Sequence, residues 1–209
     1  LLDILKNMTD DDLIEFRYLN ERLLISQNKS KYNLQVLPAN EFPIVNLPPQ
    51  PQKTINIPQK KLKELIQSIS FSMAFQDVRY YLNGLFIKIT SEEIITVATD
   101  GHRLAINSDS VELAGIQEKE EIEIIIPRKA VTEIEKLCDY TDEDLKIIFY
   151  QQYLKLELKS LQLITKLIDG KYPDYKKVIP DQTLAAVKIR RLELLSCLQT
   201  VSVLTADKF

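Results

Sequence analysis

The chain has few of the residue types from which most catalytic and metal sites are built. Its 209 residues include one histidine, two cysteines, four glycines and no tryptophan. Common zinc-type sites need several His or Cys ligands, which one histidine and two distant cysteines do not supply. No glycine-rich phosphate loop of the GxGxxG or GxxxxGK type occurs. We therefore expect no enzyme activity, no metal and no cofactor.

Long apolar runs are absent as well. No stretch of 18 apolar residues occurs, and Asp3 and Lys6 interrupt the apolar start, which lacks a signal-peptide cleavage pattern. We expect no membrane partner and a cytoplasmic protein. Cys138 and Cys197 lie far apart within helical patterns, which is typical of buried, reduced thiols in such a protein. A net charge of −3 does not by itself indicate a nucleic-acid partner.

What the chain does contain is a repeat. The segment 1–47, which begins LLDILKNMTDDDLIEFRY, recurs as 131–178, which begins VTEIEKLCDYTDEDLKIIFY. A second segment, INIPQKKLKELIQSI from Ile55, recurs as AVKIRRLELLSCLQT from Ala186. The offset of about 130 residues is the size of a domain rather than of a solenoid repeat. We therefore predict tandem domains: the C-terminal part of a first domain (1–52), a complete second domain (53–184) and the start of a third (185–209). We expect the chain to be a fragment of a longer protein.

Hydrophobic periodicity predicts an α+β fold with helices packed on antiparallel sheets. Residues 1–8, 58–70 and 127–137 have helical spacing, and the Pro-rich segment 42–51 is the expected linker. Strands are predicted at 13–18, 22–27, 32–37, 55–57, 80–89, 93–99, 103–108, 121–126, 145–150, 153–158 and 161–167. The order β-α-β-β-β is thus expected twice within 53–184.

Each of three predicted helices begins with basic residues. They are Lys60, Lys61 and Lys63, then Arg128 and Lys129, then Lys188, Arg190 and Arg191. The helix dipole disfavours cations in a first turn, so their recurrence suggests a shared anionic partner. Duplex DNA held by sequence-independent phosphate contacts fits this pattern, provided that the cations face a common axis. The alternative is a solvated charged face without a ligand.

Two further segments are distinctive. The string TVATDGHRLA (96–105) predicts a hairpin corner, because Asp-Gly is a strong turn pair, and it places His102 and Arg103 at the surface. Local hydrogen bonds alone can explain this turn. Asp100 and His102 can also be interpreted as a base and its orienter, although the sequence places no Ser or Cys nucleophile beside them. The string FQDVRYYLNG (75–84) combines an arginine with tyrosines that can contact phosphates or stack on bases, or that merely begin a strand.

The strings FSMAFQDVRYYLNG, VATDGHRLA, IPRKAV and KLIDGKYPDYKKVIP resemble the bacterial DNA polymerase III β subunit family, the replicative sliding clamps. The resemblance runs from Leu1 to Phe209. It implies three similar domains per chain and a homodimeric ring whose twelve helices surround duplex DNA, with no catalytic role. The implied partners are DNA, the polymerase III alpha subunit, clamp-loader subunits and other peptides that carry the clamp-binding motif.

The resemblance also implies two sets of site residues. Those that match a peptide-binding cleft are Leu82, Thr99, Gly101, His102, Arg103, Leu104, Pro173, Lys177, Val178 and Phe209. Those that match DNA contacts are Gln76, Arg79, Tyr80, Tyr81, Arg128 and Lys129. Phe75 stands where relatives often carry a polar or basic side chain. Lys177 replaces a common arginine, which removes a planar hydrogen-bonding fork.

Two alternatives from other functional classes stay open. One is a peptide-docking scaffold that does not encircle DNA and whose basic helices serve only packing. The other is a hydrolase that uses Asp100 and His102.

Overall fold

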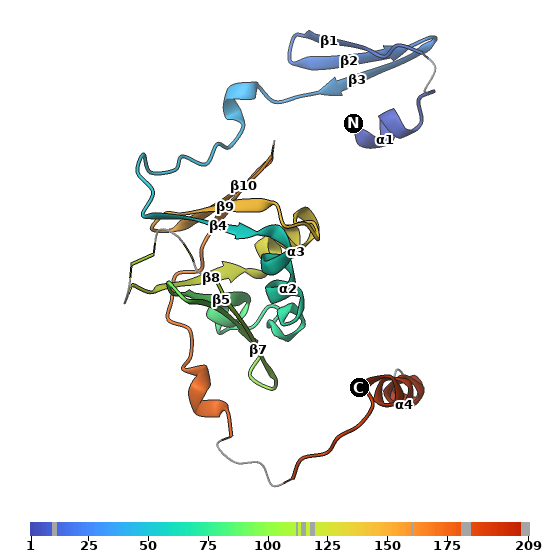
Figure 1. Cartoon of the computed structure of the whole chain (residues 1–209). Coiled ribbons are helices and arrows are strands. Elements are labelled where there is room, and N and C mark those ends of the chain that lie inside the picture. Colours follow the sequence, from blue (N-terminus) through green and yellow to red (C-terminus); the bar gives the residue numbers. More distant parts are fainter. Residues whose placement is uncertain are drawn as a thin grey trace.

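The computed structural model describes residues 1–9, 12–111, 113, 116–117, 120–159, 161–180 and 185–205. Three groups of elements follow one another along the chain (Figure 1). We call them the N-terminal segment (1–35), the central unit (53–178) and the C-terminal helix α4 (Arg191–Thr205). Phe209 of the predicted cleft lies outside the described residues.

The N-terminal segment consists of one short helix and one sheet. Helix α1 (Leu2–Lys6) precedes the antiparallel strands β1 (Glu15–Leu19), β2 (Arg22–Gln27) and β3 (Ser30–Gln35). The β1–β2 turn has positive φ at Asn20 and Glu21, as turns that match the twist of a hairpin require. Among the described residues of this segment, only Ile25 and Gln27 are buried.

A largely exposed connection leads from β3 to the central unit. It contains a single 3-10 turn, η1 (Ala39–Glu41), and otherwise no regular structure up to Gln52. Four prolines between residues 43 and 51 explain this, because proline has no N–H group to donate to a sheet.

The central unit contains two four-stranded antiparallel sheets and two helices. One sheet has the order β11-β10-β9-β4 and the other β7-β6-β5-β8. The strands are β4 (Lys53–Pro58), β5 (Gly84–Ile89), β6 (Glu93–Thr99), β7 (Leu104–Ser110), β8 (Ile122–Pro127), β9 (Asp144–Phe149), β10 (Tyr153–Leu158) and β11 (Leu161–Lys166). Helix α2 (Gln59–Gln67) follows β4, and α3 (Arg128–Leu137) follows β8. The predicted double β-α-β-β-β order is therefore confirmed.

The core lies between these sheets and the two helices. In strand β10, for example, the alternate residues Leu154, Leu156 and Leu158 are all buried in this core. Helix α2 contributes Leu62, Leu65 and Ile66 at helical spacing. Burying one such side chain stabilises the fold by about 1.5–3 kcal/mol.

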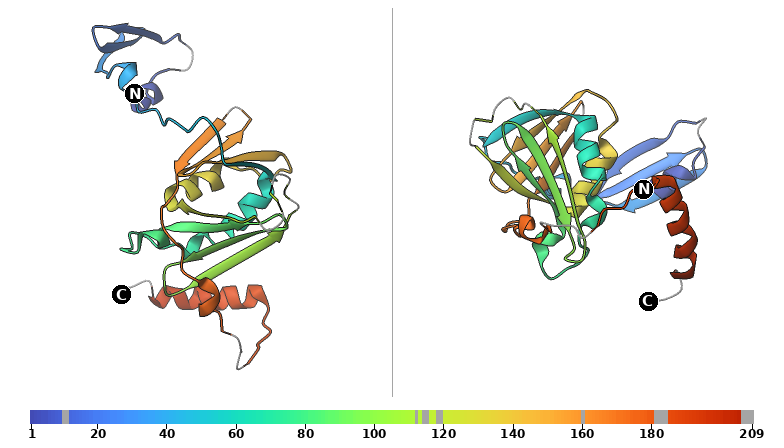
Figure 2. Two further views of the ribbon diagram at one scale, coloured as in Figure 1. Left: turned by 90° about the vertical axis from the view of Figure 1, so that its left-hand side faces the viewer. Right: turned by 60° about the horizontal axis from the view of Figure 1, so that its bottom comes forward.

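The two helices run side by side in opposite directions (Figures 1 and 2). The first turn of α2 is bonded to the loop after α3, because the Lys60 amide donates to the Thr141 carbonyl at 3.0 Å. The first turn of α3 is bonded to the segment after α2, because Arg128 Nη1 donates to the Met73 carbonyl at 2.8 Å. The basic first turns of α2 and α3 therefore lie at opposite ends of the helix pair.

Two predicted boundaries differ from the structure by three residues or more. The strand expected over 80–89 begins only at Gly84, and residues 80–82 form a 3-10 turn, η3 (Tyr80–Leu82). Paired hydrogen bonds impose this turn: the Asp77 amide donates to Asn83 Oδ1 at 2.9 Å, and Asn83 Nδ2 donates to the Asp77 carbonyl at 2.8 Å. The helix expected to reach residue 70 ends at Gln67, and a separate 3-10 turn, η2 (Ser70–Ser72), follows it.

Helix α4 is long, but its side chains from Arg191 to Val203 are all exposed. Arg190 forms an ion pair with Glu193 at 3.3 Å, next to the first turn of the helix. No helix within the described ranges is both long and apolar enough to cross a membrane.

Candidate functional site

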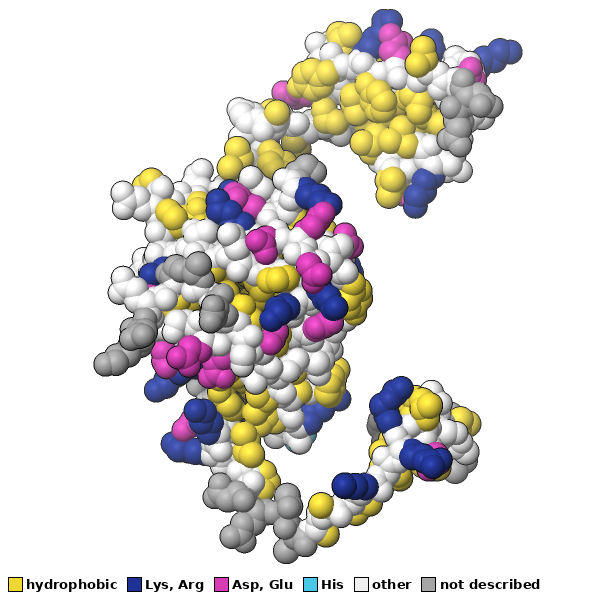
Figure 3. Space-filling model, in the orientation of Figure 1, with side chains coloured by type: hydrophobic (Ala, Val, Ile, Leu, Met, Phe, Trp, Pro, Cys, Tyr) yellow, Lys and Arg dark blue, Asp and Glu magenta, His cyan; other side chains and the backbone are white. Residues whose placement is uncertain are grey.

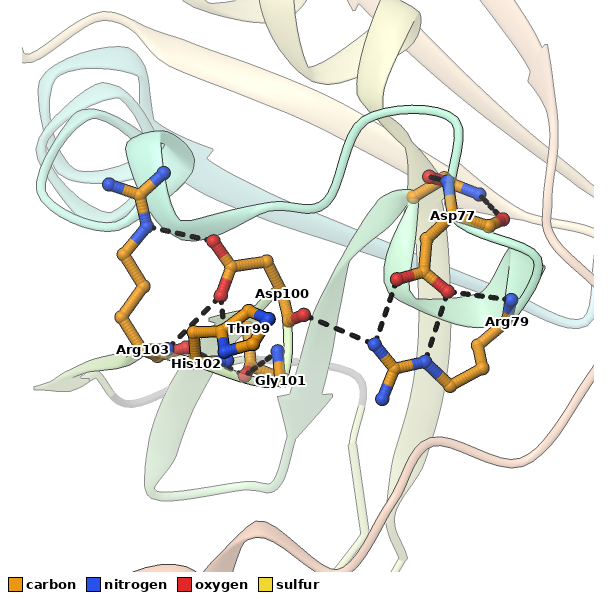
Figure 4. Close-up of polar contacts among 8 residues, drawn as sticks. Asp77, Arg79, Thr99, Asp100, Gly101, His102 and Arg103 are labelled. Carbon is orange, nitrogen blue, oxygen red and sulfur yellow. Dashed lines mark hydrogen bonds and ion pairs between the residues drawn. The ribbon is translucent and has the colours of Figure 1, made fainter. Parts of the chain in front are cut away.

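The turn between β6 and β7, which we call the corner, is held by hydrogen bonds from its own side chains (Figure 4). Thr99 Oγ1 donates to the Arg103 carbonyl at 2.7 Å and accepts from the Gly101 amide at 3.0 Å. Asp100 Oδ1 accepts from the amides of His102 and Arg103 at 2.9 and 3.0 Å. Arg103 Nε donates to the other Asp100 oxygen at 3.0 Å. The turn is thus rigidly held, while His102 and Arg103 remain exposed.

Arg79 connects this corner to the loop that precedes β5. Its Nε and Nη2 atoms donate to the two carboxylate oxygens of Asp77, at 3.0 and 2.8 Å. The same Nη2 donates to the Asp100 carbonyl at 3.2 Å. Figure 4 shows the guanidinium between the two loops, facing both.

The two carboxylates of this network remain ionised at low pH. Hydrogen bonds from the Arg79 guanidinium lower the pKa of Asp77 to about 2, from an ordinary value of 3.8. The backbone amides of His102 and Arg103 lower the pKa of Asp100 to about 2, and the Arg103 side chain adds to this. Because both pKa values are lowered by folding, the carboxylates favour the folded state above pH 4, and that contribution is lost between pH 4 and 2.

An apolar cluster lies behind the corner. Its buried members are Ala74, Leu82, Phe86, Val97, Ile125 and Tyr172. Leu104 and Tyr175 pack against it from the surface. The ring of Tyr172 stacks on Phe86, with centroids 4.9 Å apart, and burial raises the pKa of the tyrosine to about 12. The segment that contains Tyr172 is therefore anchored beside Leu82 and Leu104.

The corner site consists of Leu82 and Thr99–Leu104, which the structure brings together. Three other predicted cleft residues, Pro173, Lys177 and Val178, lie on the exposed segment that follows Tyr172. Lys177 pairs with Asp174 at 3.2 Å, and Val178 is 66% exposed and lies outside the apolar cluster. Sequence reasoning missed Asp77, although its position two residues before Arg79 was an available signal.

Four of the six predicted DNA contacts line a hollow of about 640 Å³ at the start of α3. They are Gln76, Tyr80, Arg128 and Lys129. The other two lie elsewhere, because Arg79 faces Asp77 and Tyr81 packs against the apolar cluster. Phe75, which is 73% exposed, forms part of the wall of the hollow.

The basic residues of α2 and α3 divide into two groups. Arg128 is held by the Met73 and Ala74 carbonyls and lies 5.7 Å from the centre of the Phe75 ring. Lys61 pairs with Asp109 at 3.1 Å, and Lys63 donates to the Cys138 carbonyl at 2.7 Å. Lys60 and Lys129 have exposed side chains. The predicted basic face is therefore largely engaged in contacts within the protein.

The chemistry of the remaining candidates is limited. Asp100 accepts hydrogen bonds from two backbone amides and from the Arg103 side chain, and none of the hydrogen bonds described for it comes from the His102 imidazole. The arrangement is therefore a turn rather than a catalytic base with an orienting residue. Within the described ranges, no group of three or more His, Cys, Asp or Glu residues is arranged to hold a metal ion. Burial raises the pKa of Cys138 to about 11, which keeps this thiol neutral.

Comparison with known proteins gives a consistent result. The family model described as DNA polymerase III beta subunit, central domain, matches residues 56–174. The beta sliding clamp of Pseudomonas putida is 35% identical over 209 residues, which are 100% of this chain and 56% of that protein. The beta sliding clamp of Escherichia coli K12 is 37% identical over 179 residues, 85% of this chain and 47% of that protein. The chain thus spans about half the length of these curated relatives.

Solved structures show the same similarity. The crystal structure of the DNA polymerase III subunit beta from Pseudomonas aeruginosa has a TM-score of 0.77 and 38% sequence identity, and the match covers 87% of this chain and 49% of that one. A Pseudomonas aeruginosa sliding clamp bound to griselimycin has a TM-score of 0.75 at 38% identity, over 87% of this chain and 48% of that one.

Proposed function

The chain belongs to the DNA polymerase III beta subunit family, and from this premise we propose that it is part of a DNA sliding clamp. A clamp of this kind is a non-catalytic ring that encircles duplex DNA and keeps a polymerase on it. The observation that carries the proposal is the family match to 56–174, which spans both β-α-β-β-β halves and the paired helices. On this proposal residues 53–184 are a whole clamp domain, between the end of one (1–52) and the start of another (185–209).

Encirclement requires only weak contacts with DNA, because strong contacts would impede sliding. The hollow at the start of α3 offers such contacts through Gln76, Tyr80 and Lys129, and Lys60 offers one at the other end of the helix pair. A few exposed cations supply phosphate contacts without reading the base sequence. On this proposal Arg128 shapes the hollow through the carbonyls that it binds.

We further propose that the corner site docks short peptides from the polymerase alpha subunit, the clamp loader and other replication proteins. Half-buried Leu104 lies beside exposed His102 and Arg103, which combines an apolar contact with polar groups that fix orientation. On this proposal Pro173, Lys177 and Val178 complete the site, and Phe209, which lies outside the described residues, is assigned to it by the resemblance alone. The ring is a homodimer and the protein is cytoplasmic.

The test uses a hybrid in which residues 53–184 replace the matching domain of the Pseudomonas aeruginosa clamp. The hybrid is loaded onto nicked circular DNA and onto the same DNA after linearisation, and its retention is measured by gel filtration. We expect retention on the circle and loss from the linear form, because a closed ring cannot leave a circle but slides off free ends. Equal loss from both would overturn the proposed encirclement.

A second candidate function, a docking scaffold without encirclement, is favoured by one observation. Lys61, Lys63 and Arg128 already have partners inside the protein, as packing residues would. Charge reversal of the exposed Lys60 and Lys129 in the hybrid distinguishes the two functions, with charge reversal of the exposed Lys166 on strand β11 as the control. A clamp loses loading in the double variant and keeps it in the control, whereas a scaffold behaves alike in both.

A further inference from the structure

Arg79 ties together two parts of the chain that sequence reasoning assigned to different functions. Its own loop, 77–82, contains Tyr80 of the hollow and Leu82 of the corner site. The guanidinium spans from the Asp77 carboxylate, at 2.8 Å, to the carbonyl of Asp100 in the corner, at 3.2 Å. Three N–H groups on two nitrogens are engaged in these contacts. A phosphate ligand would have to compete with a carboxylate that remains ionised above about pH 2.

The fit between Arg79 and Gly101 is close. A Cβ atom on Gly101 would lie 2.9 Å from Nη2, 3.0 Å from Nη1 and 3.3 Å from Cζ of Arg79. Both terminal nitrogens are nearer to this position than Cζ is, so the guanidinium turns the edge between Nη1 and Nη2 toward Gly101. Gly101 also has a φ of +90°, which side-chain-bearing residues rarely adopt. The Arg79 guanidinium is therefore in close contact with the turn of the corner site.

We infer that Arg79 is a positioning residue of the corner site and not a phosphate ligand. This inference rests on the proposed docking function of the corner. The Asp77 carboxylate orients the guanidinium through two parallel hydrogen bonds, and the guanidinium supports Gly101 and the Asp100 carbonyl. Loop 77–82 and turn 99–103 thus hold one another in register. Leu82 and Leu104 consequently present a fixed surface to a docked ligand.

Lysine distinguishes the two roles. A lysine at position 79 keeps the charge, which suffices for a phosphate contact, but it lacks the planar fork that binds Asp77 and Asp100 together. Arg79→Lys and Arg79→Ala are introduced into the hybrid clamp described above. On the proposed docking function, griselimycin, which a Pseudomonas aeruginosa clamp binds, is taken as the probe of the corner site. Its binding is measured by calorimetry, and duplex DNA binding is measured by fluorescence anisotropy at several salt concentrations.

The positioning role predicts that both variants weaken griselimycin binding by about tenfold, while the slope of log affinity against log salt for DNA stays unchanged. Lys129→Ala is the matched control, and it lowers the magnitude of that slope by about 0.9, as the loss of one phosphate contact requires. The inference is overturned if Arg79→Lys binds griselimycin like the parent, or if Arg79→Ala lowers the slope as Lys129→Ala does. If the parent hybrid itself does not bind griselimycin, the docking function fails separately.

A measurement on the 209-residue chain needs no ligand. In an amide NMR spectrum, Arg79→Lys and Arg79→Ala should both shift the signals of Thr99–Arg103, and the Gly101 amide should exchange faster. Gly101→Ala should perturb the parent more than it perturbs Arg79→Ala, since the close contact with the guanidinium is then absent. Additive shifts, or signals unmoved by Arg79→Lys, would contradict the positioning role.

Discussion

The N-terminal segment and the second half of the central unit share a helix followed by three antiparallel strands, but the apolar residues of these elements are buried to different extents. Leu13 and Leu145 occupy matching positions in the repeat, yet Leu13 is 97% exposed and Leu145 is 0% exposed. In the central unit β4 pairs with β9, and the opposite sheet and helices cover the apolar face. The described N-terminal segment has strands β1–β3 without such a cover, and Figure 3 shows hydrophobic side chains gathered on it. The spacing of apolar residues therefore determines which helix and strands form, whereas the burial of those residues depends on a second sheet and helices that cover them.

The largest difference is expected between the reaction rates of the two cysteine thiols, one in the central unit and one in α4. Cys138 is fully buried and its pKa is raised to about 11, whereas Cys197 is exposed. Reaction of Cys138 requires the core to open, so we expect a rate about 1000-fold below that of Cys197. Labelling with an aromatic disulfide at pH 8 should show two phases. Cys197→Ser should remove the fast phase alone; a single fast phase for both thiols would show that the core is not closed.

The matched leucines give the next largest effect. Leu145→Ala should destabilise the central unit by about 3 kcal/mol, because it leaves a cavity in a closed core. Leu13→Ala should change stability by less than about 0.5 kcal/mol, because its side chain is already in solvent. Urea unfolding followed by circular dichroism measures both. Similar costs at the two positions would mean that the N-terminal segment has a cover of its own.

The sequence predicted the element order well because periodicity and proline act locally. Pro58 and Pro127 stand immediately before α2 and α3, and each suits the start of a helix. The turn at Tyr80–Leu82 was missed because hydrogen bonds between Asp77 and Asn83 override an apparently strand-like run. Alternation of apolar residues carries no information about such side-chain pairs.

The candidate site was predicted only in part, for a similar reason. The resemblance located the corner and the hollow, and Asp-Gly indicated the turn. It could not show that Arg128 and Lys63 are held by backbone carbonyls, since those acceptors lie far away along the chain. Spacing identifies a basic residue, but only the packed structure shows whether its charge is available.

The loop before β1 and its counterpart before β9 are held in different ways, and this gives a smaller effect. In the N-terminal segment the buried Gln27 side chain accepts from the Thr9 amide at 3.0 Å and donates to the Thr9 and Asp12 carbonyls. In the central unit a buried glutamine, Gln59, accepts from the Asp139 amide at 3.1 Å, but the Thr141 carbonyl, which matches Thr9, accepts from the Lys60 backbone amide. Gln27→Ala should therefore speed hydrogen exchange of the Thr9 amide about tenfold, through the loss of about 1–1.5 kcal/mol. Lys60→Ala keeps its amide donor and should leave the Thr141 loop unchanged, so a comparable loosening there would contradict this comparison.

The smallest effect concerns the two hairpin turns. The β6–β7 turn places glycine at its positive-φ position, whereas the β1–β2 turn places Asn20 at φ 48° and Glu21 at φ 58°. Asparagine tolerates the left-handed region, but glutamate is strained there, and Asn-Gly is the favoured pair for this turn. Glu21→Gly should therefore stabilise the N-terminal hairpin by about 0.5 kcal/mol, since relief of strain is partly offset by the greater entropy of glycine in the unfolded chain.

The opposite kind of change in the central unit, replacement of a positive-φ glycine by Gly101→Ala, should be destabilising, because it adds backbone strain and a close contact with Arg79. Exchange rates of the β1–β2 amides report the first change and urea unfolding the second, and a hairpin loosened by Glu21→Gly would show that Glu21 has a stabilising role that outweighs its strain.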